Sequence, residues 1–70
     1  NAVTEKPVIY AQGSRILTTV PGRMEVFNLQ GASILTTYVH NELGRNFSKG
    51  LYIVRLTTDD NKVVSAKINI

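Results

Sequence analysis

Few residues of this 70-residue chain could do catalytic chemistry. The one histidine, His40, stands before Asn41 and Glu42 in a polar stretch, and the chain has no G-x-S-x-G motif to supply an activated nucleophile. A solvated loop histidine is therefore the simpler interpretation. Glu25 and Glu42 are single carboxylates in unrelated segments, so they do not suggest the carboxylate pair of a glycosidase. We expect no enzyme activity.

Metal and cofactor motifs are also missing from the sequence. Asp59, Asp60 and Asn61 could offer oxygen ligands to calcium, but they lack the alternating spacing and terminal Glu of an EF-hand loop. The five glycines match neither a P-loop nor a dinucleotide fingerprint. Without Cys, the chain can form neither a disulfide nor a zinc-thiolate site. We expect no metal and no cofactor.

The charge pattern restricts the class of partner. Eight Lys and Arg residues against five Asp and Glu give a net charge of +3, and the basic residues are spread along the chain without forming a run. A nucleic-acid surface would need a clustered basic stripe, so we expect no nucleic-acid partner. The mild basic balance suits an anionic partner, although ordinary solubility explains it equally well. No apolar run approaches the ~20 residues of a membrane helix, so we expect no transmembrane segment.

The elements that must position any site are strands. β-branched and aromatic residues are enriched between turn residues, and no stripe of apolar residues has the 3.6-residue period of a helix. A short extra edge strand is expected around Arg45–Phe47. The main strands are predicted at about Val8–Ala11, Arg15–Val20, Met24–Leu29, Ser33–Val39, Leu51–Thr57 and Lys62–Ile70.

Turn residues separate these strands. Pro21 and Gly22 suit the two central positions of a type II turn, and Gly31 is expected at positive φ. Gly50 should begin a strand where φ is positive or where a side chain would collide. Residues 58–61 should close the last hairpin, because Asp and Asn tolerate left-handed conformations.

Alternation within the strands predicts which side chains face inward. The predicted core residues are Val26, Tyr52, Val54, Val64, Ala66 and Ile68. Leu51 and Ile53 then form an unusually apolar outer face. This two-sided pattern favours an all-β fold, a small antiparallel β-sandwich of six to seven strands, with a five-stranded barrel as the competing architecture.

Three segments, taken in order, resemble one known family. Met24–Ile34, Gly50–Leu56 and Lys67–Ile70 are similar to the V-x-V-Y/F-D/N-x-x-G strand-turn, the G-x-Y-x-V-R/K strand and the Lys-plus-apolar last strand of type IX secretion C-terminal sorting domains of Gram-negative bacteria, the Por secretion tail. The resemblance covers about Ile16–Ile70. It departs from the family where Tyr10 is followed by Ala, Gln and Gly rather than by Pro-Asn-Pro.

The resemblance implies an immunoglobulin-like sandwich over residues 7–70 that labels its parent protein for export. Residues 1–6 would be a linker from upstream cargo, in keeping with a piece excised from a longer protein. The cargo would fold in the periplasm, pass through the type IX outer-membrane translocon and reach the cell surface or the medium. A sortase-like enzyme would cut upstream of the domain and join the cargo to anionic lipopolysaccharide, although a few members of the family stay in place as carriers.

The resemblance also implies the residues that the translocon recognises. They are Gly31, Gly50, Tyr52, Arg55, Lys67, Ile68, Asn69 and Ile70. Each has a structural role as an alternative: the glycines as backbone devices, Tyr52 as a core ring and Arg55 as a solvated charge. Ile68 and Ile70 should both seal the core and present the terminal strand.

Two other function classes stay open. A small carbohydrate-binding or protein-binding module would need an exposed aromatic platform, and the chain has five aromatic residues and no Trp. A structural end-cap of a larger secreted protein is the other class, with a weak homodimer formed through an exposed face at Leu51 and Ile53. A signal peptide in the parent protein and a stop codon directly after Ile70 would favour the sorting domain.

Overall fold

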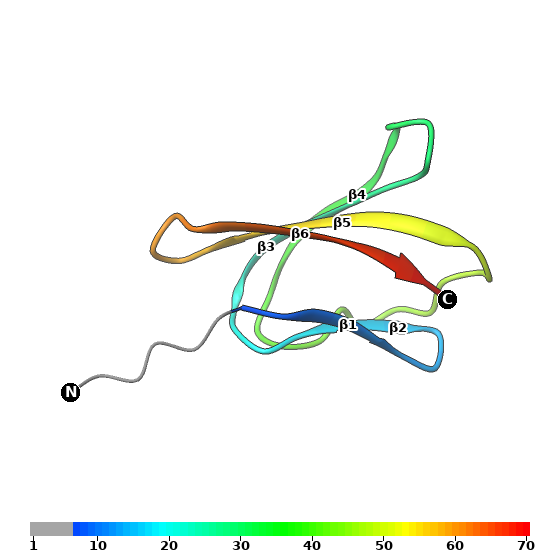
Figure 1. Ribbon diagram of the computed structural model, residues 1–70. Helices are drawn as coiled ribbons and strands as arrows, with labels where there is room; N and C mark the ends of the chain where they lie inside the picture. Colours follow the sequence, from blue (N-terminus) through cyan, green and yellow to red (C-terminus); the bar gives the residue numbers. More distant parts are fainter. Residues whose placement is uncertain (1–6) are drawn as a thin grey trace.

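The computed structural model describes residues 7–70; the expected linker, residues 1–6, lies outside the described residues. This part of the chain is all-β, with no helix, and therefore contains no helix that could cross a membrane (Figure 1). Its strands are β1 (Ile9–Gln12), β2 (Arg15–Thr18), β3 (Gly22–Phe27), β4 (Ser33–Val39), β5 (Leu51–Thr58) and β6 (Val63–Asn69). The six main strands predicted from the sequence are confirmed, with small shifts at their ends.

The strands form two antiparallel sheets. β1 pairs with β2, and the larger sheet has the order β4-β3-β5-β6. Figure 1 shows the β1–β2 hairpin lying against one face of the larger sheet, with β1 near β6. The fold is therefore a small antiparallel β-sandwich rather than a closed five-stranded barrel.

The extra edge strand expected around Arg45–Phe47 is wrong as a regular strand. Residues 41–47 do run beside β2, but only Glu42 forms a strand-like bridge, with Leu17. Three backbone hydrogen bonds join the segment to β2 and the residue before it: Thr18 N to Asn41 O (2.8 Å), Leu43 N to Ile16 O (3.0 Å) and Phe47 N to Ser14 O (2.8 Å). Arg45 N also donates to the Leu43 carbonyl at 2.7 Å, and this tight local turn interrupts the extended backbone.

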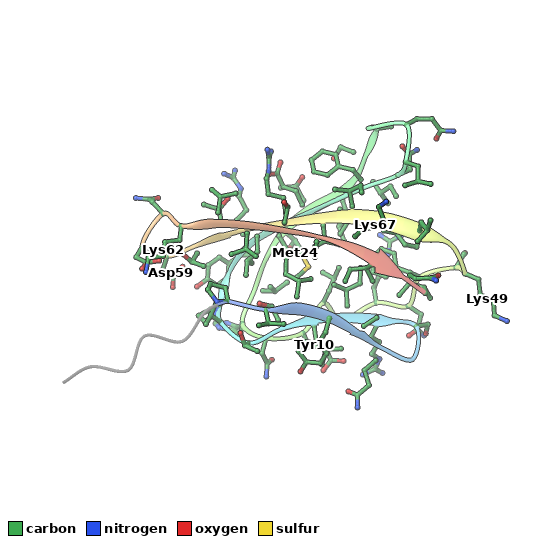
Figure 2. The ribbon with its side chains drawn as sticks, viewed as in Figure 1. Tyr10, Met24, Lys49, Asp59, Lys62 and Lys67 are labelled. Carbon is green, nitrogen blue, oxygen red and sulfur yellow. The ribbon has the colours of Figure 1, made fainter. Side chains whose placement is uncertain are left out.

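The core lies between the two sheets, where Figure 2 places Met24. The buried apolar residues are Ile9, Ile16, Met24, Val26, Val39, Leu43, Phe47, Val54, Leu56 and Ile68. Of the predicted core, Val26, Val54 and Ile68 are buried, and Tyr52, Val64 and Ala66 are half-buried against the same cluster. The predicted inward phase of β3, β5 and β6 is therefore confirmed. Leu43 and Phe47, from the irregular segment, were not predicted.

The opposite face of the larger sheet has no second layer among residues 7–70. Leu51 is 40% exposed there, and Phe27 and Ile53 are half-buried. Cross-strand pairing puts Phe27 beside Ile53 and Ile53 beside Lys67. In a two-layer sandwich each sheet has only one covered face. The apolar side chains on the uncovered face therefore reduce their exposure to solvent by packing beside one another rather than against a partner sheet.

Two turns behave as the sequence predicts. Gly31 has φ of 88° and Asn61 has φ of 67°. The Asn28 side chain accepts hydrogen bonds from Gln30 N (3.0 Å) and Ala32 N (2.9 Å), which fixes the β3–β4 turn.

The type II turn predicted at Pro21 and Gly22 is wrong. Gly22 is the buried first residue of β3, and its φ is not positive. A Cβ at this position would lie 2.4 Å from the Thr57 carbonyl oxygen of β5. Gly22 therefore serves the close approach of two strands rather than a turn conformation.

We expect Gly22→Ala to lower the free energy of unfolding by about 1–3 kcal/mol, because β3 and β5 must separate to admit the methyl group. Denaturant unfolding measures the change. Gly44→Ala is the matched control, since a Cβ at Gly44 meets nothing within 4 Å and its φ is not positive. Equal unfolding free energies for the two variants would show that the strands do not meet in this way.

The β5–β6 turn predicts a pH dependence of stability. The hydrogen bond from the Thr58 hydroxyl lowers the pKa of Asp60, and Lys62 acts in the same direction. Because the folded state then binds fewer protons than the unfolded state, whose Asp pKa is about 3.9, the stabilisation is present above that pH and is lost as the pH falls through the native pKa. Asp60→Asn should therefore lower the melting temperature near neutral pH and have no effect in acid below the native pKa. A deficit of the same size at both pH values would contradict this assignment.

Candidate functional site

The register of β5 and β6 brings six of the eight predicted recognition residues to one end of the larger sheet (Figure 1). Leu51 pairs with Asn69, Tyr52 with Ile68, and Ile53 with Lys67. We call this cluster the terminal-strand site, which consists of Gly50, Tyr52, Lys67, Ile68, Asn69 and Ile70.

Gly50 and Ile70 close the end of the site through their backbones. Ile70 N donates to Gly50 O at 2.9 Å, and Gly50 N donates to Ile70 O at 3.2 Å. Gly50 has φ of 151°, and a Cβ there would meet nothing within 4 Å. Of the two roles considered for this glycine, positive φ is confirmed and steric collision is wrong.

The inward half of the site belongs to the core. Ile68 is 6% exposed, and Ile70 is half-buried against the core cluster. Tyr52 lies opposite Ile68, its ring meets the Phe47 ring edge-on at 5.3 Å, and its hydroxyl donates to the Ser48 carbonyl at 2.7 Å. Tyr52 therefore ties the irregular segment before β5 to the sheet. In the sequence, the burial of Phe47 is indicated only by its being a large apolar residue within a polar stretch.

The outward half of the site presents polar side chains to solvent. Lys67 and Asn69 are both exposed and alternate with the inward Ile68 and Ile70. Figure 2 labels Lys67 on β6. Among residues 7–70, Lys67 forms no ion pair. Its cross-strand neighbour is the half-buried Ile53, so a free cation stands beside an apolar surface.

Arg55 lies apart from the terminal-strand site. Its Nε donates to Glu25 Oε1 at 2.9 Å, its Nη2 lies 2.8 Å from the same oxygen, and its guanidinium is 5.6 Å from the centre of the Phe27 ring. The cation is therefore already engaged within the sheet. The sequence alone does not reveal this pair, because only the β3–β5 register shows that Glu25 faces Arg55.

Gly31 also lies outside the terminal-strand site. It belongs to the β3–β4 turn, where Gly31 N donates to the Asn28 carbonyl at 3.0 Å. The structure assigns it a backbone role in this turn.

β6, which carries the site, is an edge strand. Among the described residues it forms a ladder only with β5, and β1 runs near it without hydrogen-bonded pairing. Main-chain groups on the outer edge of β6 are thus outside any ladder of the fold. A Lys on an edge strand is also a common protection against pairing with unrelated chains.

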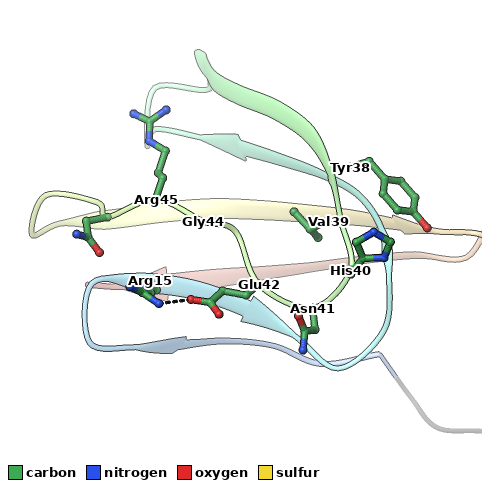
Figure 3. A pocket seen from close by; sticks show the side chains of 9 residues that line it. Arg15, Tyr38, Val39, His40, Asn41, Glu42, Gly44 and Arg45 are labelled. Atoms are coloured by element: carbon green, nitrogen blue, oxygen red, sulfur yellow. Dashed lines mark hydrogen bonds and ion pairs between the residues drawn. The ribbon is translucent and has the colours of Figure 1, made fainter.

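A separate open hollow lies between the end of β4 and β2 (Figure 3). Its lining residues are Arg15, Tyr38, Val39, His40, Asn41, Glu42, Gly44, Arg45 and Asn46. Arg15 forms an ion pair with Glu42, and the Tyr38 and His40 rings meet edge-on at 5.6 Å. The Tyr38 hydroxyl, the one hydroxyl in this lining, donates to Asp59, and this hydrogen bond raises the pKa of Tyr38. The hollow therefore contains one ion pair, and its one hydroxyl donates to the carboxylate of Asp59, which is not a lining residue.

The candidate calcium ligands of the β5–β6 turn are engaged within the fold. Asp60 accepts a hydrogen bond from Thr58, and Asp59 accepts from Tyr38. Within residues 7–70, no group of three or more His, Cys, Asp or Glu side chains could hold a metal ion.

No family model, curated protein or solved structure matches this chain.

We expect Gly50→Val to lower the free energy of unfolding by about 1 kcal/mol or more, because a β-branched residue enters the positive-φ region only at a cost. Thermal unfolding measures the effect. Gly44→Val is the control, since that position needs neither positive φ nor empty space. If both variants melt at the wild-type temperature, Gly50 is not held in this conformation.

Proposed function

We propose that residues 7–70 are a sorting domain whose last strand is recognised by the type IX translocon of a Gram-negative bacterium. The domain directs its parent protein from the periplasm to the cell surface or the medium. The observation that supports this proposal best is the alternation of buried and exposed side chains in β6. Ile68 is buried in the core, while Lys67 and Asn69 on either side of it are exposed.

This arrangement suits recognition because the residues that anchor β6 in the fold are different from those that a partner would contact. Ile68 and the Gly50–Ile70 hydrogen bonds fix the strand, so the outward side chains are presented in one geometry. An exposed, unpaired Lys contributes little to folding, within about 0.5 kcal/mol. A partner that pairs with the edge of β6 would gain affinity from main-chain hydrogen bonds and specificity from Lys67 and Asn69.

In this scheme the domain is a substrate rather than an enzyme. A sortase-like enzyme cuts upstream of residues 7–70 and joins the released cargo to anionic lipopolysaccharide. The support for these later steps is the sequence resemblance, which also allows the domain to stay attached as a carrier. Arg55 has a smaller part in recognition than Lys67, because Glu25 already pairs with it.

A structural end-cap is the second candidate function. The burial of Ile68 and the two hydrogen bonds between Gly50 and Ile70 favour it, since both show the end of β6 completing the fold. Replacing the exposed pair Lys67 and Asn69 separates the two candidates, because the change should impair recognition by a translocon but leave the stability of an end-cap unaltered.

Residues 1–70 fused behind a periplasmic reporter should reach the cell surface or the medium in a type IX-competent host. The double variant Lys67→Ala/Asn69→Ala should remain in the periplasm with an unchanged melting temperature, because both side chains are exposed. Val63→Ala, on the same outward face of β6 and 60% exposed, is the matched control and should be exported. Cell fractionation and the melting temperature of each purified domain are the measurements.

Two results would overturn the sorting proposal. One is an intact fusion that stays in the periplasm, and the other is a double variant that is exported as well as the wild type. Deleting Lys67–Ile70 should also stop export, but it removes buried Ile68, a loss of about 2–5 kcal/mol for truncation of a buried Ile. The point variants are therefore the decisive test.

A further inference from the structure

β4 forms the other edge of the larger sheet, and its outer side is open. Among residues 7–70 the strand pairs only with β3, and no backbone hydrogen bond joins Ser33–Val39 to any other segment. In Figure 1 the β3–β4 hairpin extends away from the rest of the sandwich. The outer main-chain groups of β4 thus have no partner within the described fold.

β4 also lacks most of the devices that protect an edge strand. Its sequence, SILTTYV, contains no charged residue, no Pro and no Gly, and it is rich in residues that favour strands. One bulge is present, because Val26 pairs with Leu35 while Phe27 pairs with Ser33, which leaves Ile34 as the extra residue. Beyond the bulge, Leu35–Val39 is regular and uncharged.

The exposed side chains of β4 leave the edge accessible. Thr36 and Tyr38 face outward from the sandwich, and Tyr38 is 52% exposed. The Tyr38 hydroxyl donates to both carboxylate oxygens of Asp59, each at 3.0 Å, in the turn after β5. This contact holds the largest side chain of β4 over the sheet, toward β5, rather than across the open edge.

We propose that β4 pairs antiparallel with β4 of a second copy of this chain, across a two-fold axis. The pleats of the two paired strands must match, so side chains that face outward lie opposite side chains that face outward. The two-fold axis therefore passes between one residue of β4 and the same residue of the second copy. With the axis at Thr36, that residue faces its own copy. With the axis at Thr37, each Thr36 faces Tyr38 and each Leu35 faces Val39. Both registers pair uncharged side chains of types that stabilise antiparallel strands.

The lack of charge on β4 favours a second copy of this chain as its pairing partner over a strand of a different protein. A strand from a different protein would find no charge on Leu35–Val39 to complement, whereas the two-fold registers make the strand complementary to itself. The face at Leu51 and Ile53, the dimer surface expected from the sequence, cannot pair through its main chain, because β5 lies between β3 and β6. A single strand pair is a small contact, so the dimer should be weak and dependent on concentration.

Analytical ultracentrifugation of the purified chain over a range of concentrations tests the proposal. The wild type should change from monomer to dimer by about 1 mM, the weak end of specific affinities. Thr36→Lys should remain a monomer, because the two Thr36 positions are directly opposite or diagonal in both registers and would bring like charges together. Val63→Lys places the same charge on the opposite edge strand, at a residue 60% exposed, and should dimerise as the wild type does.

A charge-swap mixture tests the geometry directly. Thr36→Glu alone should be a monomer, and an equal mixture of Thr36→Lys and Thr36→Glu should recover the dimer. The melting temperature of each variant at low concentration verifies that the monomer is folded. A wild type that stays monomeric to about 1 mM would overturn the proposal. So would a Thr36→Lys variant that still dimerises, a Val63→Lys variant that loses the dimer, or a mixture of folded charge-swap variants that remains monomeric.

Discussion

The pairing of β5 with both β3 and β6 is the constraint on which the rest of this fold depends. It buries Val54 and Leu56 at the centre of the sheet and requires Gly22, because the β3 backbone passes so close to the Thr57 carbonyl. It also fixes the register that places Tyr52 opposite Ile68. In a domain this small nearly every strand contributes to one core, so a displacement of β5 would disturb the core and the terminal-strand site together.

Much of this arrangement could be predicted from residue alternation. The inward phase of β3, β5 and β6 followed from Val26, Val54 and Ile68, because a strand with one buried face repeats every two residues. The segment 41–47 could not be predicted in the same way. Its buried residues, Leu43 and Phe47, stand at turns and isolated hydrogen bonds that follow no period.

The glycines show a second limit of prediction from the sequence. Gly22 and Gly31 are the same residue type next to turn-forming neighbours, yet one avoids a clash with a neighbouring strand and the other adopts positive φ. The sequence shows a glycine at both positions, but it does not show which of the two reasons applies. The pair Glu25 and Arg55 was hidden for a related cause, since residues thirty positions apart meet only when the register is known. Apart from Gly31 and Arg55, the residues implied by the family resemblance lie together at one end of β5 and β6. The alternation of side chains along β6 then distinguishes the residues that anchor this strand from those that face outward.

The nearness of β1 to β6 has a consequence for the order of events in synthesis. The first described strand and the last lie near each other, and Ile9 of β1 shares the core with Ile68 of β6. A ribosome releases β6 after every other described strand, so the core cannot be completed until β6 has emerged. Contacts between distant parts of a chain also make folding slow. The domain therefore folds as one unit only after its synthesis has passed β6, and until then the unfolded chain is accessible to chaperones.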